Sequence, residues 1–343
     1  MPPRNHPKGL QPRTWALLGA RAGDNDQVIA LAETLGFRFT EKPLHYNRFH
    51  ALGPRLLGRS FASLKSSSRD SLLEEPPPEL TISTGHRSVP VVRALRRRSG
   101  GALRSIHLGF PRVSPAEFDL VITTPQYAIH DHPNVLRIPY ALTRAVTEPP
   151  EPGSLAPLES FPSPRRLLIV GGPTLFWELD EEALFRTVKA MLDEASTSGG
   201  SVLVTTSPRT PVLIRNELLA LMNRSGVQTL LAEPGQLPAY RSLLFAADSM
   251  RVTADSVSMI SDAIWARKPL ALVPILMSAA GRTVFAMHDR VRPGSRVYPQ
   301  DLRFFWKALG EIGISETLAL PTTSTSEVIA AVEARLRLIL AAP

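Results

Sequence analysis

The sequence predicts an α/β protein made of two lobes, each built on a parallel β-sheet, with a ligand cleft between them. The chain has 343 residues, of which 43% are hydrophobic. This length is too great for one ordinary core and suits two domains of about 150 residues each. Short apolar runs alternate with helical patterns along the chain, as is typical of parallel α/β units. A proline-rich stretch, Glu148–Pro164, interrupts this series near the middle.

The proline-rich stretch sets the expected domain boundaries. Residues 1–13 are rich in proline and basic residues and lead into no long apolar run, so we expect a loose tail and not a secretory signal. The N-terminal, acceptor-side domain follows at 14–148. Proline at this density can continue neither a helix nor a central strand, which predicts a linker at 149–164. The C-terminal, nucleotide-side domain covers 165–343, and its closing helix could pack back on the first lobe.

The apolar pattern places the elements in each half. Strands of the first half are expected at residues 15–18, 37–40, 80–83, 105–108, 120–123 and 136–138, and helices at 26–35, 54–64 and 89–98. Strands of the second half are expected at residues 166–170, 202–205, 229–231, 250–253 and 270–273, and helices at 181–195, 211–223, 239–246, 257–266 and 328–340. In such open sheets, ligands bind beyond the carboxyl ends of the strands.

The composition excludes several classes of site. Cysteine is absent, which excludes disulfides, cysteine-ligated zinc and a thiol nucleophile. His130-Asp131-His132 stands beside Pro133 in an expected loop, so we predict no metal site there, and no prosthetic group elsewhere. No apolar run approaches the roughly 18 residues that span a bilayer. We therefore expect a cytoplasmic protein, peripheral on the inner face of the cytoplasmic membrane.

The net charge of +8 is unevenly distributed. Residues 1–150 carry 20 Lys and Arg against 12 Asp and Glu, whereas residues 151–343 carry 19 of each. Such an excess attracts phosphates or an anionic membrane surface, although a solvated basic surface explains it equally well. Basic and apolar residues also mix in Pro54–Phe61, either for a membrane surface or for ordinary packing. No nucleic-acid-binding pattern is present.

Three turns in the second half each follow an expected strand. In the last of these, Asp255, Ser256 and Ser258 can cap a helix whose free N–H groups suit a phosphate, and Asp262 could bind ribose hydroxyls. An ordinary capped helix without a ligand is the alternative. The candidate nucleotide-binding residues of this turn are Asp255, Ser256, Ser258, Met259 and Asp262.

The other two turns offer hydroxyls, an arginine and paired glycines. Thr210 fits a helix cap before Pro211, and Arg209 can pair with a diphosphate through its planar fork. Paired glycines let a backbone approach a ligand closely, but they form neither the dinucleotide fingerprint nor a P-loop. A turn without a ligand is again the alternative in both cases. The candidate residues here are Gly171, Gly172, Thr174, Thr206, Ser207, Arg209 and Thr210.

Two turns in the first half carry the candidate catalytic residues. Asp24 follows the first strand, where it could act as a general base or merely cap the next helix. His86 follows a later strand and could contact an acceptor or a phosphate, although lone histidines are more often structural. The expected acceptor or phosphate contacts beside them are Asn25, Gln27, Arg87 and Ser88.

Taken in order, these segments resemble one known family. The matching segments are Trp15-Ala16-Leu17-Leu18, Ala22-Gly23-Asp24-Asn25 with Gln27 and Gly36, Gly85-His86-Arg87-Ser88, Gly171-Gly172-Pro173, Thr205–Pro211, Asp255–Met259 and Phe304-Phe305-Trp306. The sequence is similar to the family of the plant elongated-mitochondria fission factor and its bacterial homologues. The family usually has an arginine or a similar residue where this chain has His86, which puts a shared role for position 86 in doubt.

The resemblance implies a fold and, more loosely, a function. The family looks like the GT-B glycosyltransferases, with two Rossmann-like lobes, parallel sheets and a cleft. It implies transfer of a sugar from a nucleotide-sugar donor to a membrane-associated lipid or envelope-glycan acceptor, with a nucleoside diphosphate as product. The alternative is a non-catalytic adaptor that uses this fold to bind a protein partner, which the sequence does not identify. A sugar-nucleotide epimerase is disfavoured because the dinucleotide fingerprint is missing.

Overall fold

The computed structural model describes residues 12–127, 129–144, 150, 153–288, 300–322 and 324–341. These residues form two compact units. Unit 1 takes its described residues from Met1–Leu142, Gly294–Asp301 and Thr325–Pro343, and unit 2 from Thr143–Pro293 and Leu302–Ser324. Most of the expected tail, residues 1–11, lies outside the described residues, as do residues 149, 151 and 152 of the expected linker.

Unit 1 is built on a six-stranded parallel sheet. Its strands are β1 (Thr14–Leu18), β2 (Phe39–Pro43), β3 (Leu80–Thr84), β4 (Arg104–Leu108), β5 (Leu120–Thr123) and β6 (Val135–Arg137). Their order in the sheet is β2-β1-β3-β4-β5-β6, and every neighbouring pair is parallel. All six strands therefore end at the same edge. The buried face includes Trp15, Leu17 and Val121, which belong to one apolar cluster.

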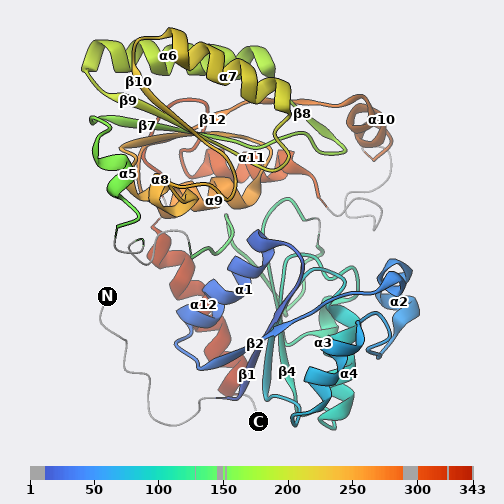
Figure 1. The fold of residues 1–343 in the computed structure, drawn as a ribbon. Helices are drawn as coiled ribbons and strands as arrows, with labels where there is room; N and C mark the ends of the chain where they lie inside the picture. Colours follow the sequence, from blue (N-terminus) through green and yellow to red (C-terminus); the bar gives the residue numbers. More distant parts are fainter. Residues whose placement is uncertain are drawn as a thin grey trace. The chain divides into compact units, whose positions relative to one another are not determined.

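Helices cover both faces of this sheet (Figure 1). They are α1 (Ala22–Thr34), α2 (Gly53–Leu57), α3 (Ser66–Leu73), α4 (Val89–Arg98) and α12 (Thr325–Ala341), with short 3₁₀ helices η1 (Arg48–Leu52) and η2 (Pro115–Glu117). Figure 1 shows α1 and α12 over one face and α3 and α4 over the other. The C-terminal helix α12 thus belongs to unit 1, to which it contributes the buried side chains Val328, Val332 and Leu336.

Two helices of unit 1 differ from the prediction for identifiable reasons. The expected helix over residues 54–64 ends at Leu57, because Gly58 has a positive φ of 57° that breaks the helical path. The expected helix over residues 26–35 begins earlier, at Ala22. Asp24 and Asn25 therefore lie inside the first turn of α1 and do not precede it. Helix α3 was not predicted, since six of its eight residues are polar or charged.

Unit 2 is built on a five-stranded parallel sheet and a two-stranded ribbon. The sheet contains β7 (Arg165–Val170), β9 (Ser201–Thr206), β10 (Gln228–Ala232), β11 (Ser249–Thr253) and β12 (Leu270–Val273), in the order β10-β9-β7-β11-β12. The ribbon pairs β8 (Trp177–Leu179) with β13 (Ile275–Met277) in antiparallel fashion. The ribbon was not predicted, because three-residue strands carry too short a pattern.

Helices complete the described part of unit 2. They are α5 (Ala156–Glu159), α6 (Glu181–Ser198), α7 (Val212–Arg224), α8 (Tyr240–Ala246), α9 (Val257–Trp265), α10 (Ala279–His288) and α11 (Leu302–Glu311). In Figure 1, α6 and α7 cover one face of the sheet, and α8, α9 and α11 the other. A core cluster that includes Leu184, Val188 and Met191 lies between α6 and the sheet. Helices on both faces leave the strand ends as the open edge of the unit.

The predicted fold class is confirmed in its main features. Both units are α/β, and the main sheet of each unit contains only parallel strands. Among the residues described, no helix combines the length and the hydropathy that crossing a membrane requires. The fold therefore presents two sheet edges, one in each unit, where side chains from separate turns can gather.

Candidate functional site

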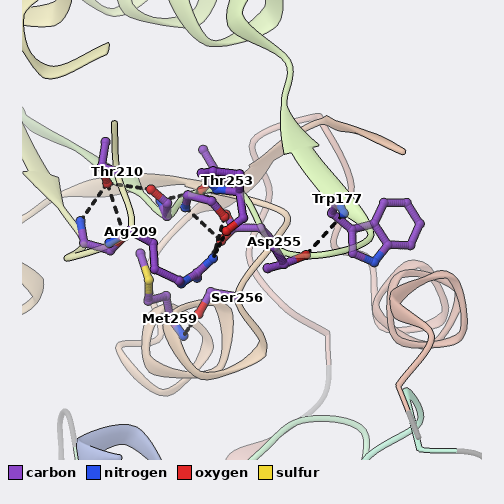
Figure 2. A network of polar contacts seen from close by, with 12 residues as sticks. Trp177, Arg209, Thr210, Thr253, Asp255, Ser256 and Met259 are labelled. Atoms are coloured by element: carbon purple, nitrogen blue, oxygen red, sulfur yellow. Dashed lines mark hydrogen bonds and ion pairs between the residues drawn. The ribbon is translucent and has the colours of Figure 1, made fainter. Parts of the chain in front are cut away.

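The first candidate site lies at the carboxyl edge of the unit 2 sheet. Strands β9, β7 and β11 are neighbours in that order. The turns that follow them contain Arg209, Gly171 and Asp255, so residues up to 84 positions apart in sequence meet at this edge. Figure 2 shows the resulting network of polar contacts. The three turns that follow these strands are therefore in contact with one another.

The carboxylate of Asp255 joins the three turns. One of its oxygens, Oδ2, accepts hydrogen bonds from the backbone N–H of Gly172 at 3.0 Å and from Nη2 of Arg209 at 2.8 Å. The other, Oδ1, accepts from the hydroxyl of Thr253 at 2.6 Å, and that hydroxyl accepts from Gly171 N–H at 2.8 Å. The Asp255 side chain is only 2% exposed. Its charge is therefore compensated inside the protein, as burial requires.

Both glycines of the β7 turn are required by this close packing. A Cβ atom at position 171 would lie 2.1 Å from Oδ1 of Asp255, and one at position 172 would lie 2.3 Å from the carbonyl oxygen of Arg209. Neither distance is compatible with a side chain. The paired glycines thus let the Asp255 and Arg209 turns approach the end of β7, and the structure gives them this packing role.

Thr210 has a different role from the predicted one. Its neighbour Pro211, and not Thr210, occupies the N-cap position of α7, which begins at Val212. The Thr210 hydroxyl points to the end of β7, where it lies 2.5 Å from the Gly171 carbonyl oxygen, and it accepts from Ser207 N–H at 2.9 Å. The prediction that Thr210 caps the helix was therefore wrong. The hydroxyl of Thr206 is buried and has no partner among the described residues.

Arg209 is partly engaged and partly exposed. Its Nη2 binds Asp255, and its Nη1 donates to the carbonyl oxygen of Gly172. The side chain is nevertheless 41% exposed. Arg209 therefore joins the turns and keeps one side of its guanidinium in solvent. Its binding to a diphosphate remains a prediction.

The N-terminus of α9 supplies the remaining residues of this edge. Ser256 is its N-cap and accepts from Met259 N–H at 3.5 Å, and its hydroxyl lies 3.2 Å from that of Ser258. Asp262, two turns along, accepts from the hydroxyls of Thr143 and, at 3.2 Å, Tyr240. Burial, and then the Asp262 carboxylate, raises the pKa of Tyr240. Asp262 thus has protein partners of its own, and ribose binding by it remains a prediction.

Two tryptophans support this edge, which was not predicted from the sequence. The ring N–H of Trp306, on α11, donates to the carbonyl oxygen of Ala254 at 2.9 Å. Trp306 also packs edge-on against Trp177, with 4.8 Å between ring centroids. The backbone of Trp177 in turn binds the hydroxyl of Thr174 at 3.2 Å. Trp306 therefore supports the turn that carries Asp255.

The second candidate site is a pocket of about 280 Å³ at the carboxyl edge of the unit 1 sheet. Its walls come from the segments that follow β1 to β5, together with Gln300, so they span five strands. The lining residues are Gly19, Ala20, Arg21, Asp24, Tyr46, Thr84, Gly85, His86, Arg87, Leu108, Phe110, Arg112, Tyr127 and Gln300. The predicted residues Asp24, His86 and Arg87 therefore share one pocket.

Burial and charge shift the two predicted catalytic groups. Burial raises the pKa of the Asp24 carboxyl, and the Arg21 guanidinium opposes this rise. Burial, and then the positive charges of Arg112, Arg87 and Arg21, lower the pKa of His86 to about 4. His86 is therefore neutral at pH 7. A carboxylate with a raised pKa is a stronger base than an ordinary one, which suits proton abstraction.

The other three predicted contacts in unit 1 hold the turns and do not line the pocket. The Asn25 side chain accepts a hydrogen bond from the backbone N–H of Gly19 at 2.8 Å and donates one to the Gly19 carbonyl oxygen at 3.0 Å. Ser88 donates to the carbonyl oxygens of Thr84 and Gly85, at 3.0 and 2.9 Å. Gln27 donates to Gly23 at 3.3 Å. The structure thus places Asn25 and Ser88 behind the pocket wall.

The sequence analysis missed four prominent residues of the pocket. Tyr46, Arg112 and Tyr127 come from the segments after β2, β4 and β5, and Arg21 is the residue just before α1. Arg21 could have been found, because it stands in the same turn as Asp24. The other three had no local signal, since only the order of the strands brings their segments to one edge.

The comparisons with known proteins identify a family and a fold. A family model described as "Mitochondrial fission ELM1" matches residues 22–309. Among curated proteins, "Uncharacterized protein RP120" of Rickettsia prowazekii (strain Madrid E) is 21% identical over 293 residues, covering 75% of this chain and 81% of that protein. The region that the family model matches contains every residue predicted for the two sites, whereas Gly19, Ala20 and Arg21 of the pocket precede it.

Solved structures share the two-lobed architecture. The UDP-GlcNAc 2-epimerase of Methanocaldococcus jannaschii has a TM-score of 0.53 at 12% identity, covering 96% of this chain and all of that one. MurG of Acinetobacter baumannii has a TM-score of 0.47 at 14% identity, covering 96% of this chain and 92% of that one. The first of these comparisons describes the fold, which is GT-B-like, and its low identity leaves the activity to be inferred from the sites.

Proposed function

The chain belongs to the mitochondrial fission ELM1 family, and from that premise we propose that it is a nucleotide-sugar-dependent glycosyltransferase. It would move a sugar from a nucleotide donor to a membrane-associated lipid or envelope-glycan acceptor. A nucleoside diphosphate would be the product. The proposal needs no metal and no prosthetic group, because the protein itself offers cations and backbone N–H groups to the diphosphate.

The convergence of three turns at the unit 2 edge carries the proposal. It presents an arginine fork, two serine hydroxyls and the N-terminus of α9 together. A helix N-terminus and a guanidinium are the groups that stabilise a diphosphate leaving group. The relative with the same fold is named for UDP-GlcNAc, so a uridine nucleotide is the donor class to test first.

Unit 1 supports the chemical step of the proposal. Asp24 lines a pocket, and its raised pKa makes it the candidate base for an acceptor hydroxyl. His86, neutral at pH 7, would accept or donate a hydrogen bond in the same pocket. We assign Asp24 to proton removal and His86 to orientation of the acceptor.

A basic and apolar surface on unit 1 favours a membrane acceptor. Phe49, Leu52 and Leu56 are 45, 50 and 78% exposed. Three exposed arginines alternate with them in η1, α2 and the residues just after, namely Arg48, Arg55 and Arg59. Apolar side chains that insert between basic ones are typical of surfaces that bind anionic membranes. Peripheral attachment at the inner face of the cytoplasmic membrane is part of the proposal.

Calorimetry with UDP and UDP-GlcNAc tests donor binding. We expect the wild-type chain to bind, and Ser258→Ala to weaken binding about 10-fold, the loss typical of a hydrogen bond to a charged group. Ser258 is the cleaner variant, because within the described part of the chain its side chain has Ser256 as its only hydrogen-bond partner. Arg209→Ala removes a partner of Asp255 as well, so its melting temperature must be measured beside its affinity. Arg224→Ala, an exposed arginine at the end of α7, is the matched control.

Turnover tests the catalytic assignment separately. Asp24→Asn should leave UDP affinity unchanged and lower the release of UDP from UDP-GlcNAc, because it removes a base and keeps the shape of the side chain. The products must be analysed for both sugar transfer and epimerisation, since the fold is shared with an epimerase. A wild-type chain with no affinity for any nucleotide or nucleotide sugar would defeat the proposal and favour the adaptor alternative.

A further inference from the structure

The pocket of unit 1 contains more positive charge than the proposed chemistry needs. Arg21, Arg87 and Arg112 line it together with one acidic residue, Asp24. With His86 neutral, three positive charges face one carboxyl group. Each of the three arginines lowers the pKa of His86 through its charge, so all three act on one point of the pocket.

None of these guanidinium groups is used to hold the fold in the part of the chain that the structure describes. Among the described residues, the side chains of Arg21, Arg87 and Arg112 form no hydrogen bond and no ion pair; only the backbone carbonyl of Arg21 is engaged, by Asn25 N–H at 3.0 Å. Other arginines of the same unit behave differently. Arg93, for example, forms two bonds to Glu117, at 2.5 and 2.6 Å. Arg21, Arg87 and Arg112 are exposed, so solvent weakens their mutual repulsion, and a bound anion would offset what remains.

The backbone also favours a ligand at this position. Arg112 has a φ of 60°, one of only two positive values among the described residues other than glycine. Such a conformation is costly for an arginine and is found most often where function requires it. Two strand-to-helix turns, before α1 and α4, line the same pocket, and the N-termini of those helices add partial positive charge.

We propose that Arg21, Arg87 and Arg112 form a binding subsite for a phosphate group carried by a compact ligand. Three guanidinium forks suit the oxygens of a phosphate. The volume of about 280 Å³ lies at the lower end for small-molecule sites and favours a head group over a whole nucleotide sugar. Tyr46, Phe110 and Tyr127 supply ring surfaces beside it. The binding of a phosphate group does not depend on the proposed function; only its use as an acceptor subsite rests on that function.

Titration of the full chain with inorganic phosphate at fixed ionic strength tests the subsite. We expect binding by the wild-type chain and a weakening of 10-fold or more in Arg21→Gln, Arg87→Gln and Arg112→Asn, as for loss of a charge-assisted contact. Asparagine is chosen at 112 because it tolerates positive φ. Arg97→Gln is the matched control, an exposed arginine of the same unit outside the pocket. Melting temperatures identify any variant that fails to fold, and the other two then decide.

Two results would overturn the subsite: no phosphate binding by the wild-type chain at millimolar concentration, or equal affinity in the three pocket variants and Arg97→Gln. Failure of the proposed function has a different signature, because phosphate would still bind through the arginines while UDP did not. Vesicles that carry phosphatidic acid distinguish the source of the phosphate from vesicles of equal charge made with phosphatidylglycerol. A preference that the three variants abolish supports a lipid-borne phosphate, and phosphate binding without that preference supports a soluble ligand.

Discussion

Asp255 shows how one buried side chain can specify a whole sheet edge. It accepts bonds from the turns after β7 and β9 and from Thr253 at the end of its own strand, β11. The sequence analysis found all three turns, because each follows an apolar strand and contains glycine, serine or threonine. It could not find which residues bind one another, since these partners are set by strand order and not by local pattern.

A methyl group at position 171 should be strongly destabilising. Its Cβ would lie 2.1 Å from Oδ1 of Asp255, and overpacking of this kind costs about 1–3 kcal/mol. We expect Gly171→Ala to lower the melting temperature by several degrees. Gly310→Ala is the control, because nothing lies within 4 Å of its new Cβ in α11, and it should raise the stability slightly. Equal melting temperatures in the two variants would contradict the packing role of Gly171.

The buried His107 and the half-buried His86 predict acid sensitivity. Burial lowers the pKa of His107 to about 3 and that of His86 to about 4. Between about pH 6.5 and pH 3, the unfolded chain binds protons that the folded chain does not. The free energy of unfolding therefore falls as the pH drops through this range. Asp24, whose pKa is raised, acts with the opposite sign, because its proton is held more tightly in the folded state.

Denaturant unfolding between pH 4 and 7 measures this dependence. His107 packs against Phe118 and contacts Ser83 at 3.1 Å. We expect His107→Leu to give a shallower decline of stability with falling pH than the wild-type chain shows. An unchanged slope would mean that His107 does not contribute to the acid sensitivity.

At the scale of elements, long apolar patterns were predictable and short or polar ones were not. Helix α4 and strands β5 and β12 have the bounds expected from the sequence. Helix α2 is shorter than expected. The pattern of apolar residues continues past Gly58, but the positive φ of Gly58 ends the helix. The ribbon of β8 and β13 escaped prediction, since its pairing joins segments about a hundred residues apart.

The surface formed by η1 and α2 should bind anionic membranes. Leu56 is 78% exposed beside Arg55 and Arg59, so replacing it with glutamate both removes apolar area and opposes the charge. We expect Leu56→Glu to weaken sedimentation with anionic vesicles, and added salt to weaken it further in both proteins. Leu213→Glu is a matched control, because Leu213 is 79% exposed on α7 of unit 2. No binding by the wild-type chain at low salt would remove the membrane acceptor from the proposal.

At the scale of the whole molecule, the two units are not consecutive stretches of the chain. Unit 1 combines its N-terminal residues with Thr325–Pro343, whereas the sequence boundaries placed that segment at the end of the second domain. Apolar periodicity predicted the helix itself but could not say which sheet it covers. Val328, Val332 and Leu336 are spaced by four residues and are all buried, which is the pattern of a helix face on a core.

Removal of α12 should therefore destabilise unit 1 more than unit 2. We expect a chain that ends at Ser324 to lose protection from hydrogen exchange first in β1 and α1, because buried apolar side chains contribute about 1.5–3 kcal/mol each. Protection in β7 and β9 should change much less. Equal loss in both units would contradict the assignment of α12. A triple variant, Val328→Ala, Val332→Ala and Leu336→Ala, provides the same test without truncation.

The position of α12 also has a consequence for biosynthesis. Domains usually fold in order as the chain leaves the ribosome, the N-terminal one first. Here the chain of unit 2 is complete at Ser324, whereas unit 1 cannot complete its core until α12 has also left the ribosome. The half of the protein that is made first therefore finishes folding last, and it must remain soluble with an incomplete core during the synthesis of roughly two hundred further residues.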